Sequence, residues 1–311
     1  MSFATEVKKE ILGNDFNNDT LSAFVAGVMQ GNVETVFKDS KLSLRITSFM
    51  PSLIRFLVPY FKKRYDINLE TFYLDRTNIN KRRIYFININ DKVQEIMEDF
   101  KIYPFYTIDD KDPIFKNDDT KKAFTAGCFV SKGSISDPRK SSYHFEILFK
   151  QIETAELVAK FMNKSYIKPS IIPKLNQYLL YIKKSEQISD ALRFIGADSG
   201  VLQFEDYRIM RDMNNSVNRA MNCDIANYKR SLEYCQNQLK AIKYLKENDL
   251  HKKMSQRLQD AMHLREIYPD STLTELSEYS EKVIGKHLSK SGISHCMSEI
   301  MEYYESIINK K

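Results

Sequence analysis

Hydrophobic and polar positions in the first third of the chain switch repeatedly between a helical and an alternating pattern. The order is helix, two strands, helix, two strands, helix, and the first helix surrounds Ala23–Gly27. After it we expect strands Val33–Phe37 and Leu42–Ser48 around a turn at Lys38–Lys41, a helix near Pro51–Tyr65, strands Ile67–Leu74 and Ile84–Ile89, and a short helix near Asp91–Phe100.

The same order of elements follows a second time. Its first helix surrounds Ala123–Gly127. The later elements are strands Ser134–Ile135 and Tyr143–Phe149 flanking a turn at Asp137–Arg139, helix Ile152–Met162, strands near Tyr166–Ile172 and Tyr178–Ile182, and helix Glu186–Phe194. Two matching series of this length predict a duplicated α+β unit.

A repeated five-residue phrase supports the duplication. Ala-Phe-Val-Ala-Gly at Ala23–Gly27 returns as Ala-Phe-Thr-Ala-Gly at Ala123–Gly127, 100 residues later. In each copy Ala and Gly, four apart, lie on one helix face and let another backbone approach closely. We therefore expect the two helices to pack together around a pseudo-twofold axis. The alternative is a coincidence between unrelated helices, and the matching downstream patterns argue against it.

The chain changes character after Gly200. Residues Leu202–Leu250 read as helical and polar, with dense Asn and several Arg and Lys residues. One interpretation is a connector that contacts DNA phosphates through Arg219 and Lys229. The other is a solvated helix pair that joins two domains.

A three-helix pattern closes the chain. The first helix, Met254–Tyr268, ends at Pro269, Thr272–Glu275 forms a capping box for the second, and Ser289 can cap the third. The third helix has an apolar stripe and a short polar face, as a helix-turn-helix requires. The DNA-binding candidates, within about 272–305, are Thr272, Thr274, Ser289, Lys290, Ser291, Ser294, His295 and Ser298.

An ordinary three-helix bundle with a solvated face is the alternative for this region. The polar face is weakly basic, and Glu299 and Glu302 make its later turns acidic. Ser and His can hydrogen-bond base edges, although less specifically than an arginine on guanine.

Composition limits the remaining classes. A net charge of +6 and a pI near 8.8 permit nucleic-acid binding. The charged start and the lack of a long apolar run predict a cytoplasmic protein without a membrane partner. No phosphate-binding glycine loop or nucleophile elbow occurs, and we expect no cofactor. No CxxC occurs either, so we expect no metal site from the four widely spaced cysteines, Cys128, Cys223, Cys235 and Cys296.

The order of elements and the glycine phrase resemble the LAGLIDADG fold of homing endonucleases, with Val25–Val33 and Thr125–Gly133 at the motif positions. More specifically, nearly the whole chain resembles the WhiA family of bacterial transcription regulators. The matching stretches are Ser2–Ile11, Lys122–Asp137, Asn218–Asn227 and Leu288–His295.

The WhiA resemblance implies two LAGLIDADG-like halves at 1–105 and 106–200, a helical linker at 201–250 and a helix-turn-helix domain at 251–311. It also implies transcription control or a role in cell division and chromosome segregation, at the nucleoid. Relatives usually carry more Arg and Lys where this chain has Cys296, Ser298 and Glu299.

The LAGLIDADG resemblance also locates the chemistry of a nuclease. Such an enzyme needs an acid near the end of each motif helix, because paired carboxylates hold the divalent cations. The register places Asn32 and Lys132 there. We therefore expect a non-catalytic protein that binds double-stranded DNA. Two alternatives stay open: a nuclease with displaced acids at Asp137 or Glu146, and an adaptor for another transcription or division protein, with a vestigial helix-turn-helix.

Overall fold

The computed structural model describes residues 2–38, 41–75, 83–140 and 142–309. The chain forms two compact units, Met1–Asp212 and Met213–Lys311, which are described separately. The turn expected at Lys38–Lys41 includes residues 39 and 40, which lie outside the described residues. In the part of the chain that is described, no helix is both long and apolar enough to cross a membrane.

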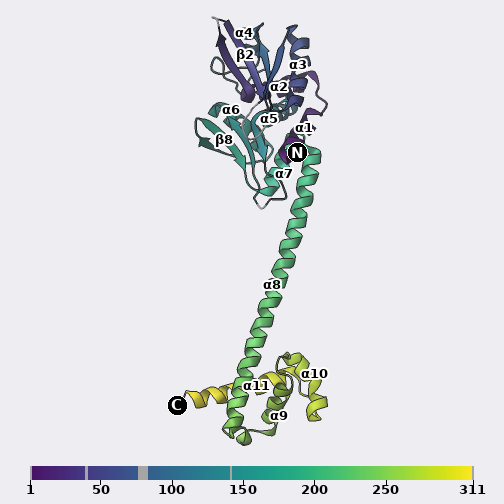
Figure 1. Ribbon diagram of the computed structural model, residues 1–311, viewed down its shortest axis with the longest axis vertical. Helices are drawn as coiled ribbons and strands as arrows, with labels where there is room; N and C mark the ends of the chain where they lie inside the picture. The colour runs from purple at the N-terminus through teal and green to yellow at the C-terminus, as the bar shows by residue number, and fades with distance from the viewer. Residues whose placement is uncertain (1, 39–40, 76–82, 141, 310–311) are drawn as a thin grey trace. The chain divides into compact units, whose positions relative to one another are not determined.

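The first unit contains one helix, α1 (Phe3–Leu12), followed by two copies of the same series of elements (Figure 1). The first copy comprises α2 (Asn18–Asn32), β1 (Val33–Lys38), β2 (Lys41–Ser48), α3 (Pro51–Tyr65), β3 (Glu70–Asp75), β4 (Arg83–Ile89) and α4 (Val93–Asp99). The second comprises α5 (Asp118–Lys132), β5 (Gly133–Ile135), β6 (Phe145–Phe149), α6 (Ile152–Lys164), β7 (Ser170–Lys174), β8 (Gln177–Ile182) and α7 (Ser185–Phe194).

Each copy builds a four-stranded antiparallel sheet with the same topology. The strand orders are β1-β2-β4-β3 and β5-β6-β8-β7. Register follows the apolar alternation: Ile46 on β2 pairs with Val33 on β1 and with Ile87 on β4, and all three are buried. The predicted α+β duplication is confirmed.

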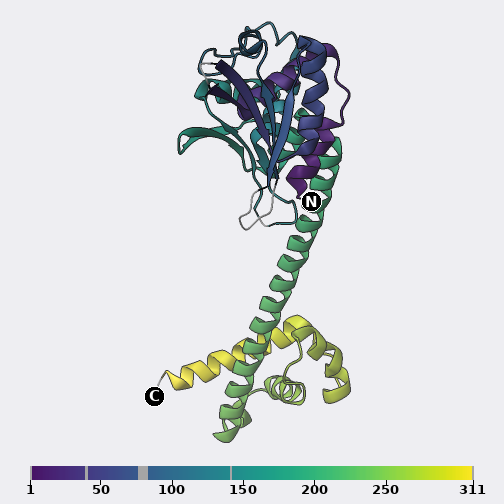
Figure 2. The ribbon, with the colours of Figure 1, turned by 45° about the horizontal axis from the view of Figure 1, so that its top comes forward.

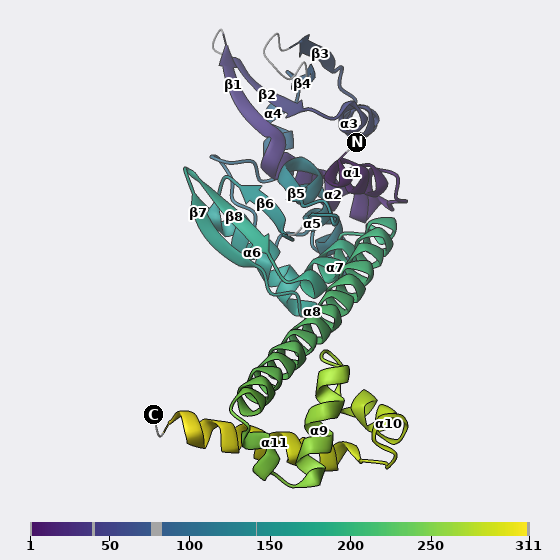
Figure 3. The same cartoon turned by 60° about the horizontal axis from the view of Figure 1, so that its bottom comes forward.

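Helices α2 and α5 pack against each other (Figure 3), and their closest approach is at Gly27 and Gly127. A Cβ added to Gly27 would lie 2.0 Å from the carbonyl oxygen of Phe124, and one added to Gly127 would lie 2.0 Å from that of Phe24. The glycine of each helix thus contacts the equivalent phenylalanine carbonyl of the other helix, as the pseudo-twofold axis requires. Only glycine allows two backbones this close.

Two strands begin later than the apolar pattern indicates. Asp66 closes α3 in the left-handed conformation, and Ile67 is buried in the core before β3 starts at Glu70. In the second copy Tyr166 has φ +62°, Ile167 is buried, and β7 starts only at Ser170. Ile67 and Ile167 therefore anchor the connection after a helix and do not belong to a paired strand.

One continuous helix, α8 (Asp198–Glu247), covers the polar stretch, so the alternative of a helix pair there is wrong. Its last turns enter the core of the second unit through Ile242 and Leu245. That unit continues with a short 3-10 turn, η1 (Leu250–Lys253), and the three helices α9 (Gln256–Ile267), α10 (Leu273–Ile284) and α11 (Lys290–Ile308), seen together in Figure 2.

Candidate nucleic-acid interface

The second helix of the C-terminal trio starts on the expected capping box. The Thr272 backbone N–H donates to Glu275 Oε2 at 2.7 Å, and the Glu275 N–H donates to Thr272 Oγ1 at 3.3 Å. Gly285 ends α10 in the left-handed conformation with φ +70°. Local sequence therefore fixes both ends of α10.

Two buried serines fix the connection into α11. Ser277 Oγ donates to the Leu288 carbonyl at 2.6 Å, and the Leu288 N–H donates to Ser280 Oγ at 2.9 Å. Ser289 Oγ then accepts from the Gly292 N–H at 3.2 Å and caps α11. The sequence showed the cap on Ser289 but gave no sign of the serine contacts, because their partners are not local.

The polar face of α11, defined as Lys290, Ser291, Ser294, His295 and Ser298, is open to solvent. Ser294 is partly buried and the other four are exposed. The opposite side is apolar, with Ile293, Met297 and Ile300 fully buried. His295 lies 3.8 Å from Glu299 on the same helix. Of the two candidates at the start of α10, Thr272 serves as its cap and Thr274 is exposed.

Arg257 on α9 also reaches the first turn of α11, which the sequence did not indicate. Its Nη2 lies 3.1 Å from the position that a Cβ on Gly292 would take. Burial raises the pKa of the neighbouring Cys296 thiol, while Arg257 acts in the opposite direction. Cys296 itself is buried, so it does not belong to the polar face.

The candidates on α8 lie in the exposed part of that helix. Arg219 and Lys229 are both exposed, and Arg219 Nε donates to the Asn215 carbonyl at 3.3 Å. By contrast, Arg265 on α9 is buried. It donates to Gln238 Oε1 at 3.0 Å and to the Ser271 carbonyl at 2.5 Å. Arg265 therefore ties α8 to the connection before α10 and is not available to a ligand.

In the first unit, the helix ends that would carry nuclease acids carry other groups. Asn32 ends α2 and is buried, and Lys132 ends α5 and is exposed. A Cβ on Gly31 would lie 2.9 Å from Lys132 Cγ, so the Lys132 stem crosses the end of α2. A neutral amide and an ammonium do not replace carboxylates as ligands for Mg²⁺.

Two more lysines converge on these helix ends. Lys150 Nζ donates to the Val33 carbonyl at 2.7 Å. Lys8 Nζ lies 5.8 Å from the centre of the Phe129 ring, one turn before Lys132. Burial and then the charge of Lys132 lower the pKa of Lys8 to about 8. Partial burial of its ammonium end also lowers the pKa of Lys150; Glu34 opposes this shift and Lys132 adds to it.

The two displaced acids stand apart from a metal-binding arrangement. Asp137 Oδ1 accepts hydrogen bonds from the Arg139 N–H at 3.0 Å and from Arg139 Nε at 2.9 Å. This contact lowers the pKa of the Asp137 carboxyl to about 2. Glu146 lies on β6, opposite Ser134 and Tyr181. Within the described residues, no group of three or more His, Cys, Asp or Glu side chains could hold a metal ion.

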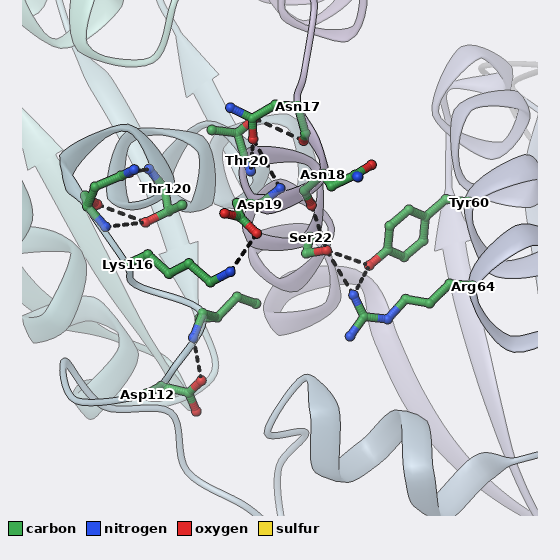
Figure 4. A network of polar contacts seen from close by, with 12 residues as sticks. Asn17, Asn18, Asp19, Thr20, Ser22, Tyr60, Arg64, Asp112, Lys116 and Thr120 are labelled. Atoms are coloured by element: carbon green, nitrogen blue, oxygen red, sulfur yellow. Dashed lines mark hydrogen bonds and ion pairs between the residues drawn. The ribbon is translucent and has the colours of Figure 1, made fainter.

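A separate polar network joins the start of α2 to α3 and to the segment before α5 (Figure 4). Arg64 Nη1 donates to Ser22 Oγ at 2.8 Å, and Arg64 Nη2 lies 3.0 Å from Asp99. Lys116 lies 2.7 Å from Asp19. The network borders a cavity of about 380 Å³. Its cations are paired with its acids, so we assign it a structural role.

Three family models match the chain and together cover most of it. They are the WhiA N-terminal LAGLIDADG-like domain at residues 18–103, the WhiA LAGLIDADG-like domain at 121–214 and the WhiA C-terminal HTH domain at 217–304. A protein of Bacillus cereus (strain B4264) named "Probable cell division protein WhiA" is 32% identical over 311 residues, which cover 99% of this chain and 97% of the relative. The chain belongs to the WhiA family.

Other WhiA proteins agree with this assignment. The "Probable cell division protein WhiA" of Lysinibacillus sphaericus (strain C3-41) is 31% identical over 99% of this chain and 98% of its own length. The crystal structure of full-length DUF199/WhiA from Thermatoga maritima matches with a TM-score of 0.59 and 23% identity, over 98% of this chain and 99% of that one. This structural match concerns the fold.

The WhiA C-terminal HTH model also includes the exposed part of α8. It begins at residue 217, so it covers both Arg219 and Lys229 as well as the three helices α9, α10 and α11. One family model therefore spans this helical segment together with the helix-turn-helix.

Proposed function

We propose that this chain is a non-catalytic DNA-binding protein that regulates transcription and acts in cell division and chromosome segregation. It would work in the cytoplasm, at the nucleoid. The observation that carries the proposal is the solvent-open polar face of α11, presented at the start of a capped helix that follows a helix-turn-helix connection. The names of the WhiA relatives support the connection with cell division.

The division of work follows from the chemistry of each surface. Ser291, Ser294, His295 and Ser298 would meet base edges, since hydroxyls and imidazole can donate and accept there. Lys290 would contact a phosphate and so would Arg257, which lies beside the same turn. Further contacts to the DNA backbone would come from Arg219 and Lys229 on α8 and from Thr272, Thr274 and Ser289.

The lack of catalysis is part of the proposal. The support for it is the pair of helix ends at Asn32 and Lys132, where one side chain is neutral and the other repels cations. Neither helix end therefore supplies the negative charge that a two-metal nuclease needs to hold its cations.

Duplex binding by a charge-deleted variant tests the assigned face. Fragments recovered by chromatin immunoprecipitation of the native protein supply the target, and fluorescence anisotropy measures affinity. The double variant Lys290→Ala, His295→Ala should bind about 10-fold or more weakly, because two contacts of about 1 kcal/mol each are lost. Lys253→Ala, on η1, is the matched control and should bind like the wild type. If the folded double variant keeps wild-type affinity, the residue assignment is wrong.

A nuclease with displaced acids is a second candidate, and it makes an opposite prediction. It would nick supercoiled plasmid in the presence of Mg²⁺, and Asp137→Asn or Glu146→Gln would abolish the nicking. Our proposal expects intact plasmid. The hydrogen bonds that Asp137 already accepts from Arg139 favour this outcome, because they occupy the carboxylate that would have to bind the metal ion.

An adaptor with a vestigial helix-turn-helix is the remaining candidate. It would bind another transcription or division protein and would shift no promoter fragment in a gel at low salt. A saturable shift that weakens as salt rises is the result expected from phosphate contacts and excludes this candidate.

A further inference from the structure

We infer that Lys8, Lys132 and Lys150 form an anion site in the first unit that binds a phosphate group. The inference does not depend on the helix-turn-helix, since the three lysines lie at the paired ends of α2 and α5. These three residues are called the lysine cluster below.

Backbone geometry brings the lysine cluster together. The glycine crossing holds α2 and α5 in contact up to their ends, and the Lys132 stem lies against Gly31 of the other helix. Lys150 reaches the residue that follows α2, where its ammonium donates to the Val33 carbonyl. Lys8 arrives from α1, over Phe129. Each lysine thus comes from a different part of the chain to the same place.

The cluster holds an excess of positive charge. Across the described residues, none of the three ammonium groups forms an ion pair with a carboxylate, and Glu34 is the acid whose charge acts on Lys150. The negative ends of two helix dipoles offset roughly half a charge each. Burial first, and the charge of Lys132 second, lower the pKa of Lys8, so both disfavour its ammonium form. A bound anion would relieve that repulsion.

The hydroxyl group of Ser131 lies beside the Lys132 stem, against the same glycine, Gly31. Ser131 Oγ is buried and has no hydrogen-bond partner in the structure, and it lies 1.9 Å from the position that a Cβ on Gly31 would take. Buried polar atoms without partners are rare in folded proteins. Lys132 and Lys150 are exposed, so a ligand can reach the cluster from solvent.

Phosphate is the anion class that this donor set fits. Lysine ammonium groups bind phosphate oxygens as point charges, and several of them can share one doubly charged group. The phosphate can come from a polynucleotide backbone or from a free oligophosphate. A purely structural role, in which the lysines only cap helix ends, predicts no ligand at all.

Calorimetric titration of the full chain with inorganic pyrophosphate tests the site. Ionic strength is held constant with chloride. Wild type should show saturable binding, and Lys132→Met and Lys150→Met should each weaken it about 10-fold or more, whereas Lys132→Arg should stay within about 3-fold of the wild type. The matched controls are Lys62→Met and Lys63→Met on the exposed end of α3. Thermal unfolding verifies that each variant is folded.

A second arm identifies the source of the phosphate. The titration is repeated with 20-base-pair duplex DNA in the Lys290→Ala, His295→Ala background, so that the helix-turn-helix is weakened independently. Residual duplex binding that pyrophosphate displaces, and that Lys132→Met removes, assigns the site to a polynucleotide backbone. Pyrophosphate binding without such competition assigns it to a free oligophosphate. Absence of saturable pyrophosphate binding in the wild type overturns the inference, and so does equal loss in the α3 controls.

Discussion

The crossing of α2 and α5 makes a sharp prediction for Gly127→Ala. The new methyl group would lie 2.0 Å from the Phe24 carbonyl oxygen and 2.9 Å from the Val28 nitrogen, and both are backbone atoms. Because carbon atoms pack at about 3.5 Å, the helices must separate by more than about 1 Å. That movement loosens the buried contacts of Phe24, Val28, Phe124 and Cys128 along the crossing.

The expected cost follows from two opposing terms. Overpacking usually costs about 1–3 kcal/mol, and we take about 4 kcal/mol here because two backbones must move apart, while replacing a helical glycine returns about 1 kcal/mol. We expect a net loss of about 3 kcal/mol in the free energy of unfolding. For a unit of this size that lowers Tm by about 6–12 °C.

Differential scanning calorimetry measures the effect, because it can resolve the transitions of two units. Gly27→Ala should cost the same as Gly127→Ala, since its methyl group would lie 2.0 Å from the Phe124 carbonyl oxygen. The double variant should cost less than the sum, because one separation of the helices accommodates both methyl groups. Gly292→Ala on α11 is the control, because its methyl group would meet only side-chain atoms, Arg257 Nη2 at 3.1 Å and Ser289 Oγ at 3.2 Å. An unchanged Tm for Gly127→Ala would refute the close crossing.

Three further predictions concern single side chains. Lys8→Met should stabilise the first unit by up to about 3 kcal/mol at pH 7, because the pKa of Lys8 falls from 10.5 to about 8 on folding. The unfolded state binds more protons between these two pKa values, so the stability gained by Lys8→Met should shrink as pH rises from about 8 to 10.5. Urea titrations at several pH values measure this gain, and a gain independent of pH would contradict the buried charge of Lys8 as its cause. Thr272→Ala should cost about 1 kcal/mol in thermal unfolding through loss of the α10 cap, whereas Thr274→Ala should cost under about 0.5 kcal/mol. Ser280→Ala should cost about 1–3 kcal/mol because the buried Leu288 N–H loses its acceptor, and equal stability would show that another group replaces it.

The fold was predictable where local chemistry dictates it. The repeated small-residue phrase indicated the pairing of α2 and α5, since a glycine inside a helix usually marks the close approach of a second backbone. The capping box at Thr272 was likewise a local signal. Such features depend on residues a few positions apart, so a single sequence displays them.

Long-range contacts left no comparable signal. Glu10 on α1 accepts from the Ser199 N–H at 2.6 Å and from the Gly200 N–H at 3.0 Å, so it caps a helix far along the chain. The positions of Lys8 and Lys150 beside Lys132 depend on the tertiary fold in the same way. Arg257 reached the first turn of α11 from another helix. The polar face of α11 could therefore be predicted from the sequence, whereas the contact of Arg257 with its first turn could not.

Site-directed photo-crosslinking tests the central account, DNA engagement through the polar face of α11, most directly. Photo-reactive benzoylphenylalanine replaces either Ser291 or Glu302, both exposed on α11, and the full chain is irradiated with a duplex recovered from the cell. The account predicts a covalent DNA adduct from position 291 and none from position 302. Adducts from position 302 alone, or from neither position while the duplex is bound, would contradict it.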